Sequence, residues 1–231
     1  MTCGVIHMQY NPFRQTKYVP FVTYTIAAIN VIMFGIEFLM GSTTDTRVLI
    51  QLGAKVDELI AAGQYWRLVT PIVLHAGFEH LLFNSIALLI WGQHAEMLLG
   101  RIKYIICYLV AGISGSLLSF ALSASVSIGA SGAIFGIFGI FLYLWHSNKQ
   151  LFNRVFGIQV LIIIGINLVA GFTTPNVDNF GHIGGLIGGF LCAQCAGLRL
   201  EQHGYTRRIL FGALLLAFMA ACFAVGMYRW G

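Results

Sequence analysis

The sequence predicts an all-α fold, a polytopic bundle of helices that cross a membrane. Of its 231 residues, 58% are hydrophobic and only 9% are charged, and the mean hydropathy is +0.82. A soluble domain carries about 25% charged residues. So few charges cannot cover a solvated surface, and the apolar residues gather in long runs. These observations predict one integral membrane domain in a lipid bilayer.

Seven apolar segments are long enough to cross a bilayer, which takes about 20 residues each. We place them near residues 20–40, 79–99, 103–123, 131–147, 154–173, 181–198 and 208–228. Residues 1–19 then form a short N-terminal segment, residues 20–198 a six-helix core, and residues 199–231 a linker with a seventh helix. The long first loop, residues 41–78, mixes charged and aromatic residues, so we expect it to be partly folded at the membrane interface.

Lysine and arginine are unevenly divided between the two sides of these spans. One side receives nine of the 13: Arg14, Lys17, Arg101, Lys103, Lys149, Arg154, Arg199, Arg207 and Arg208. The other four are Arg47, Lys55, Arg67 and Arg229. Because basic residues favour the cytoplasmic side, we expect a cytoplasmic N-terminus and an external C-terminus. No signal peptide or targeting extension is evident, which favours a bacterial cytoplasmic membrane. The net charge of +5 therefore reflects orientation, and nucleic acid is not an expected partner.

The unusual polar residues fall at one predicted depth. The second, fourth and sixth spans all enter from the outer side. His80 and Asn84 lie in the first turns of the second span, Ser131 opens the fourth, and His182 opens the sixth. Polar groups inside a membrane mark functional sites by default. A shared polar site that is open to external water explains the common depth.

Ser131 and His182 carry chemical meaning as a pair. A serine at the start of a helix is usually structural when it stands alone. A serine hydroxyl becomes a good nucleophile when a neighbouring base accepts its proton, and neutral imidazole does so near neutral pH. We therefore expect a Ser-His dyad. Asp178, which precedes the sixth span, remains open as a group that orients the histidine.

Glycines surround both residues of the pair. Gly132 with Gly136, and Gly181 with Gly185, have the small-xxx-small spacing that lets helix backbones approach closely. Helix packing alone is the simpler reading, but a hydrogen bond between serine and histidine needs the same close approach. Gly129, just before the serine, permits a turn that exposes the hydroxyl.

His80 and Asn84 stand at positions i and i+4, on one face of a helix. They could be a metal pair, but Asn is a poor ligand for transition metals and no zinc signature surrounds them. We favour hydrogen-bond donors aimed at an oxyanion, as acyl transfer through serine requires. Cys192 and Cys195 have a C-x-x-C spacing without further ligands, so we expect no metal and no cofactor.

Four elements of the sequence together resemble the rhomboid family of intramembrane serine proteases. They are Trp66-Arg67, the spacing of His75, His80 and Asn84, Gly129-Ala130-Ser131-Gly132, and Gly181-His182-Ile183-Gly184-Gly185. The resemblance runs from about Gly63 to Gly197. The family often has Ala where this chain has Gly181, and the seventh helix is similar to that of a six-plus-one subtype.

The resemblance implies a role for each residue of the site. Ser131 would be the nucleophile and His182 the general base. His80 and Asn84, with the backbone N–H of the serine, would stabilise the oxyanion. Phe135 would pack beside the histidine ring. Further implied roles, in shaping and anchoring the first loop, fall to Trp66, Arg67 and Glu96.

Two other functions remain open at this point. An inactive relative would bind transmembrane helices without cutting them, and such relatives lose the serine or the histidine, which are both present here. A transporter would need broken helices and midplane polar groups, but no inner polar set matches the outer one. The expected substrate is a single-span membrane protein cut near the outer membrane boundary. The sequence indicates neither the particular substrate nor the oligomeric state.

Overall fold

A computed structural model describes residues 18–174, 177–199 and 204–231. Nearly all of the predicted N-terminal segment 1–19 and most of the linker after residue 198 lie outside the described residues. The described chain is built from helices: α1 (Phe21–Leu39), α2 (Thr46–Gln51), α3 (Asp57–Ala61), η2 (Tyr65–Leu68), η3 (Thr70–Val73), α4 (Phe78–Ala87), η4 (Leu88–Gly92), α5 (Gln93–Leu99), α6 (Arg101–Leu122), α7 (Ser131–Ser147), α8 (Lys149–Val155), α9 (Ile158–Thr173), α10 (Asn179–Ala196) and α11 (Tyr205–Trp230). The all-α prediction is confirmed.

The helices follow the predicted spans with two differences. The second span is assembled from α4, the π-helical turn η4 and α5. The fifth begins at Ile158, because Gly157 adopts φ +62° and the chain bends by 80° between α8 and α9. Among the described residues, α1, α6 and α11 are each long and apolar enough to cross a membrane. The number of seven spans stays a prediction.

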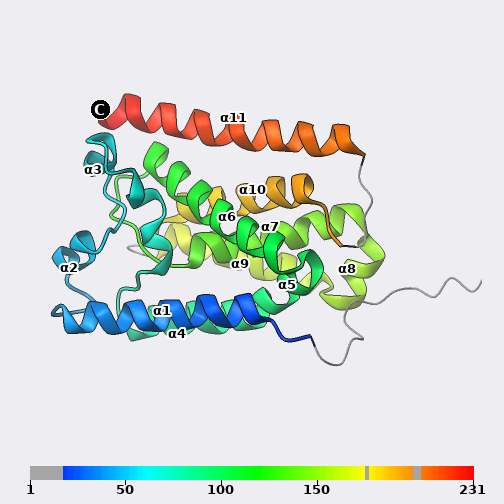
Figure 1. Cartoon of the computed structure of the whole chain (residues 1–231), viewed down its shortest axis with the longest axis horizontal. Helices are drawn as coiled ribbons and strands as arrows, with labels where there is room; N and C mark the ends of the chain where they lie inside the picture. Colours follow the sequence, from blue (N-terminus) through cyan, green and yellow to red (C-terminus); the bar gives the residue numbers. More distant parts are fainter. Residues whose placement is uncertain (1–17, 175–176, 200–203) are drawn as a thin grey trace, which may run out of the picture.

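Glycines bring α6, α7 and α10 together at the centre of the bundle, with α11 on one side and α1 and α4 on the other (Figure 1). A Cβ atom on Gly185 of α10 would overlap the carbonyl oxygen of Gly132 on α7, and one on Gly189 would overlap that of Gly136. A Cβ on Gly115 of α6 would lie 2.5 Å from the Gly181 oxygen. The small-residue faces therefore act as predicted, and the three backbones are in contact.

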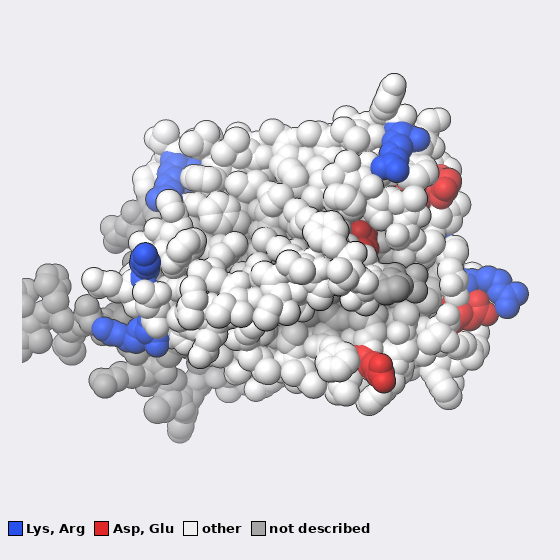
Figure 2. Space-filling model, turned by 180° about the vertical axis from the view of Figure 1, so that it is seen from behind, with Lys and Arg blue, Asp and Glu red and all other residues white. Residues whose placement is uncertain are grey.

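The molecule has a broad apolar belt. Figure 2 shows that charged side chains gather toward the two ends of one face, and that the middle is almost free of them. Large exposed apolar side chains occur on the outward faces of α1, α9 and α11, for example Phe38, Val169 and Leu216. These surfaces suit lipid and support the assignment as an integral membrane protein.

The first loop is folded around a buried arginine. The Arg67 guanidinium donates to the carbonyl oxygens of Ile50 and Ala54, at 2.8 Å each, and to the Gln64 side chain at 2.7 Å. Trp66 is 55% exposed. The contacts of Arg67 fit its implied role in the loop.

Glu96 has a different place from the one the resemblance implied. Its carboxylate accepts hydrogen bonds from the backbone N–H of Thr23 at 2.9 Å and of Val22 at 3.2 Å. Those groups belong to the first turn of α1, whose N–H groups have no partner within the helix. Glu96 therefore caps the N-terminus of α1, whereas the resemblance implied that it helps to anchor the first loop.

Candidate active site

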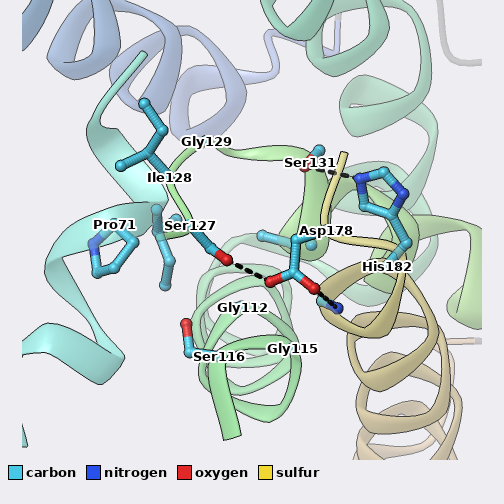
Figure 3. A pocket seen from close by; sticks show the side chains of 14 residues that line it. Pro71, Gly112, Gly115, Ser116, Ser127, Ile128, Gly129, Ser131, Asp178 and His182 are labelled. Carbon is cyan, nitrogen blue, oxygen red and sulfur yellow. Dashed lines mark hydrogen bonds between the residues drawn. The ribbon is translucent and has the colours of Figure 1, made fainter. Parts of the chain in front are cut away.

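Ser131 and His182 meet across two helices. Ser131 is the first residue of α7, and His182 lies in the first turn of α10. The Nε2 atom of His182 is 3.0 Å from the Oγ atom of Ser131, and both residues are partly buried (Figure 3). The distance is that of a hydrogen bond between a nucleophile and its base. The structure thus brings together the two residues that the sequence paired.

The imidazole ring of His182 is held by stacking. Phe135 lies one helical turn after Ser131. Its ring stacks on the His182 ring, with the two centroids 4.3 Å apart and an angle of 11° between the planes. The Nδ1 atom of His182 has no hydrogen-bond partner among the described residues. Asp178 instead accepts from the backbone N–H of Gly181 at 3.2 Å. The geometry is that of a dyad, with Asp178 capping the helix of the base.

Gly129 lies between the serine and His80. Its φ is +117°, a conformation that side chains rarely adopt. A Cβ atom there would lie 2.7 Å from the His80 ring and 3.7 Å from the Ser131 hydroxyl. The backbone N–H of Gly129 donates to the Pro71 oxygen at 2.8 Å, which fixes the turn. His80 therefore reaches the serine side of the site only because residue 129 has no side chain.

The hydrogen bonds of His80 determine which ring nitrogen faces the site. Its Nδ1 accepts from the backbone N–H of Ala76 at 3.3 Å. A neutral imidazole that accepts at Nδ1 carries its proton on Nε2. Nε2 is one of the two ring atoms that approach Gly129. His80 thus presents an N–H donor toward Gly129, two residues before the serine.

Asn84 and His75 support this arrangement. The Asn84 side chain is buried and donates to the His80 carbonyl oxygen at 3.0 Å, one turn back on α4. The ring of His75 lies 5.2 Å from the ring of His80, and the backbone N–H of His75 donates to Glu37 at 3.0 Å. Burial lowers the pKa of His75 to about 4, so this ring is neutral at physiological pH. The one hydrogen bond of the Asn84 side-chain amide among the described residues is thus to a carbonyl of its own helix, α4.

A small cavity of about 40 Å³ opens beside the pair (Figure 3). Its lining includes Ser131, His182, Gly129, Gly132 and Ser116. A single water occupies roughly 10–15 Å³ on this measure, so the cavity has room for water. The cavity is small and is lined largely by glycine and other small residues.

The sequence reasoning missed a polar cluster at the wall of the cavity, to which Ser127 and Asp178 belong. Among the described residues, Ser119 and Ser127 both donate to the Asp178 carboxylate. Lys55 joins them by donating to the carbonyl oxygen of Ser125 in the same segment as Ser127. Two local signals could have indicated it: an Asp just before a helix is typical of an N-cap, and serines recur at alternate positions from 123 to 127. That Lys55 belongs to the same cluster was not readable, because it lies far away in sequence.

Comparison with known proteins shows the family of this chain. A family model described as a Rhomboid domain matches residues 62–199. Rhomboid protease GluP of Bacillus subtilis (strain 168) is 45% identical over 212 residues, which are 92% of this chain and 41% of GluP. Putative rhomboid protease YdcA of the same organism is 36% identical over 146 residues, 62% of this chain and 73% of YdcA.

A plant protein gives the same result. RHOMBOID-like protein 5 of Arabidopsis thaliana is 38% identical over 175 residues, 74% of this chain and 55% of that protein. The chain thus spans less than two thirds of the length of GluP and of the plant relative. The matched family domain covers both Ser131 and His182, together with His80 and Asn84. This chain belongs to the rhomboid family.

Proposed function

We propose that this chain is an intramembrane serine endopeptidase that cuts transmembrane helices through a Ser131–His182 dyad. The observation that carries the proposal is the contact of 3.0 Å between His182 Nε2 and Ser131 Oγ. Ser131 is the nucleophile and His182 the general base. The relatives GluP and YdcA are named as rhomboid proteases, which supports the reaction class.

The reaction proceeds through an acyl-enzyme. Ser131 Oγ attacks the peptide carbonyl carbon while His182 Nε2 takes the hydroxyl proton. The carbonyl oxygen becomes an oxyanion, and the His80 N–H, the Asn84 amide and the backbone N–H of Ser131 stabilise it. The amine departs with the proton from His182. Water then attacks the ester by the same route in reverse, which releases the acid product and the free serine.

The substrate is a single-span membrane protein, cut near the outer boundary of a bacterial cytoplasmic membrane. A regular helix keeps its carbonyl groups in hydrogen bonds, so it must unwind before a serine can attack. Gly or Pro in the substrate helix lowers the cost of unwinding. The narrow, glycine-lined space beside Ser131 favours a small residue before the cut bond, such as Ala, Gly, Ser or Cys.

The inactive alternative, a protein that binds transmembrane helices, predicts no covalent chemistry at the serine. The test is labelling of the purified full chain with a fluorophosphonate, together with cleavage of a transmembrane substrate in proteoliposomes. Ser131→Ala and His182→Ala should each abolish labelling and cleavage, since the two residues act as one unit.

Ser116→Ala is the matched control, because Ser116 lines the same cavity. It should label and cleave like the wild type. Mass spectrometry of the product ends should place the cut near the outer boundary. Wild-type cleavage by the Ser131→Ala variant would refute the dyad, and cuts at the cytoplasmic boundary would refute the orientation.

A further inference from the structure

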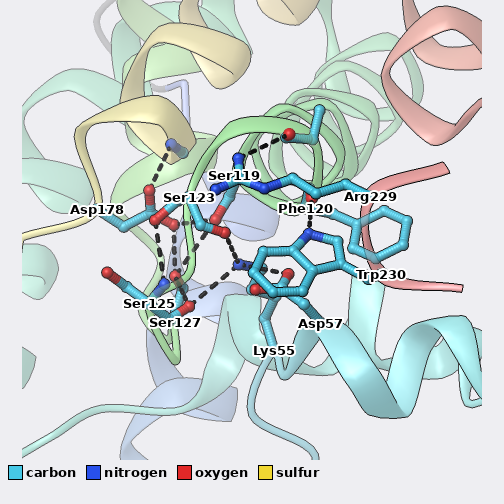
Figure 4. A network of polar contacts seen from close by, with 12 residues as sticks. Lys55, Asp57, Ser119, Phe120, Ser123, Ser125, Ser127, Asp178, Arg229 and Trp230 are labelled. Atoms are coloured by element: carbon cyan, nitrogen blue, oxygen red, sulfur yellow. Dashed lines mark hydrogen bonds and ion pairs between the residues drawn. The ribbon is translucent and has the colours of Figure 1, made fainter. Parts of the chain in front are cut away.

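The carboxylate of Asp178 joins three separate parts of the chain. One oxygen, Oδ1, accepts from the backbone N–H of Gly181 at 3.2 Å, in the first turn of α10. The other, Oδ2, accepts from the hydroxyls of Ser119 on α6 and Ser127 in the segment before α7 (Figure 4). Hydrogen bonds to a charged acceptor are about twice as strong as neutral ones. Asp178 therefore ties the start of α10 to α6 and to this segment.

The connected parts are those that carry the dyad. Gly181 directly precedes His182, and Ser127 precedes Ser131 by one short, fixed turn. A shift of Ser127 relative to Gly181 would therefore change the distance between Ser131 and His182. Misplacement of reacting groups by about 1 Å can cost about 10²-fold in rate. The dyad consequently depends on how this segment is anchored.

A buried lysine holds the same segment from its other side. The backbones of Lys55 and Ser127 pair through two reciprocal hydrogen bonds of 3.0 and 3.1 Å. The Lys55 ammonium donates to the carbonyl oxygens of Ser125 at 3.0 Å and Ser123 at 3.3 Å, and lies 2.7 Å from the Asp57 carboxylate. Burial raises the pKa of Asp57 to about 6, although the lysine opposes the shift. The segment is thus fixed between Lys55 and Asp178.

We infer that Asp178 is a positioning residue that sets the spacing between nucleophile and base by binding Ser127 and Ser119 while it caps α10. It acts through these contacts and not through the imidazole, because within the described residues the Asp178 carboxylate makes no hydrogen bond to the His182 ring. The inference rests on the proposed function of Ser131 and His182. It separates two roles of one carboxylate: capping, which uses Oδ1, and anchoring the serine segment, which uses Oδ2.

Asp178→Asn separates these roles, because Asn is as good an N-cap as Asp but lacks the charged oxygen that accepts from both serines. We expect Asp178→Asn and Ser127→Ala each to slow fluorophosphonate labelling of the full chain, and to lower kcat, by about tenfold. KM should change less than twofold. Ser127→Thr, which keeps a hydroxyl, should recover most of the rate. The double variant should be no slower than the slower single variant, because both lose the same contact.

Ser125→Ala is the matched control, since Ser125 lies in the same segment with an exposed side chain. It should label at the wild-type rate. Labelling of both Asp178→Asn and Ser127→Ala at the wild-type rate, whatever their melting temperatures, would overturn the inference. If Asp178→Asn does not fold, Ser127→Ala and Ser127→Thr decide. Ser131→Ala in the same assay isolates the proposed function: full labelling of that variant refutes the dyad itself.

Discussion

The central helices and the peripheral helices of this protein are held by different means. More than half of the apolar window of α6 is buried (56%), against 22% for α1 and 17% for α11. At the centre, glycines let α6, α7 and α10 touch backbone to backbone. At the periphery, exposed apolar side chains face outward, and α11 meets α6 through packed apolar side chains such as Phe120 and Cys222, with a few hydrogen bonds at its end.

The difference follows from the solvent. Lipid is as apolar as leucine, so burial of apolar surface does not drive helices together in a membrane. Close packing and hydrogen bonds do so instead. Ser131 and His182 both lie in the first turns of central helices, whereas His80 and Asn84 lie on α4, which flanks these helices. We therefore expect the geometry of the dyad to be sensitive to a single added methyl group between the central helices, and tolerant of one at an outward-facing position such as Gly165.

The largest effect should come from a methyl group between two central helices. The Cβ atom of Gly185→Ala would overlap the Gly132 carbonyl oxygen and push α7 from α10. Cleavage in proteoliposomes should fall by about 10²-fold or more, because the dyad separates. The comparison variant is Gly165→Ala on α9, where nothing lies within 4 Å of the new atom. Equal losses in the two variants would contradict the distinction between centre and periphery.

A smaller loss of cleavage rate is expected when the proposed oxyanion donors on α4 are replaced. Asn84→Ala should reduce kcat by roughly 10²-fold or less, because other donors remain, and His80→Ala by at least as much. Cleavage rates in detergent measure both. EDTA should leave the wild-type rate unchanged. A loss with EDTA that zinc restores would mean that His80 binds a metal.

The smallest effect should lie at the end of α11. The Trp230 indole N–H donates to the Phe120 oxygen at 2.9 Å and so satisfies a carbonyl at the end of α6. Trp230→Phe should lower stability by about 1 kcal/mol, or about 2–4 °C in melting temperature, with cleavage nearly unchanged. Tyr228→Phe, at a side chain that is 93% exposed, is the control for thermal melts. An unchanged melting temperature in Trp230→Phe would show that this bond adds nothing.

The class of protein and the candidate residues of the site could be predicted from the sequence alone. Composition required lipid, because 9% charged residues cannot solvate a surface. Spacing put His80 and Asn84 on one helical face, and glycine pairs indicated which helices approach closely. The pairing of Ser131 with His182 followed from chemistry, since few residues at one membrane depth could serve as nucleophile and base.

The contacts between residues distant in sequence are visible only in the folded chain. The sequence left open whether Asp178 orients the histidine. In the structure its carboxylate accepts hydrogen bonds from Ser119, Ser127 and the backbone N–H of Gly181. Glu96 caps α1, and Lys55 reaches the serine segment from the first loop. Helical periodicity reports which residues share a face, whereas a buried charge takes whichever partner the packed chain brings within reach.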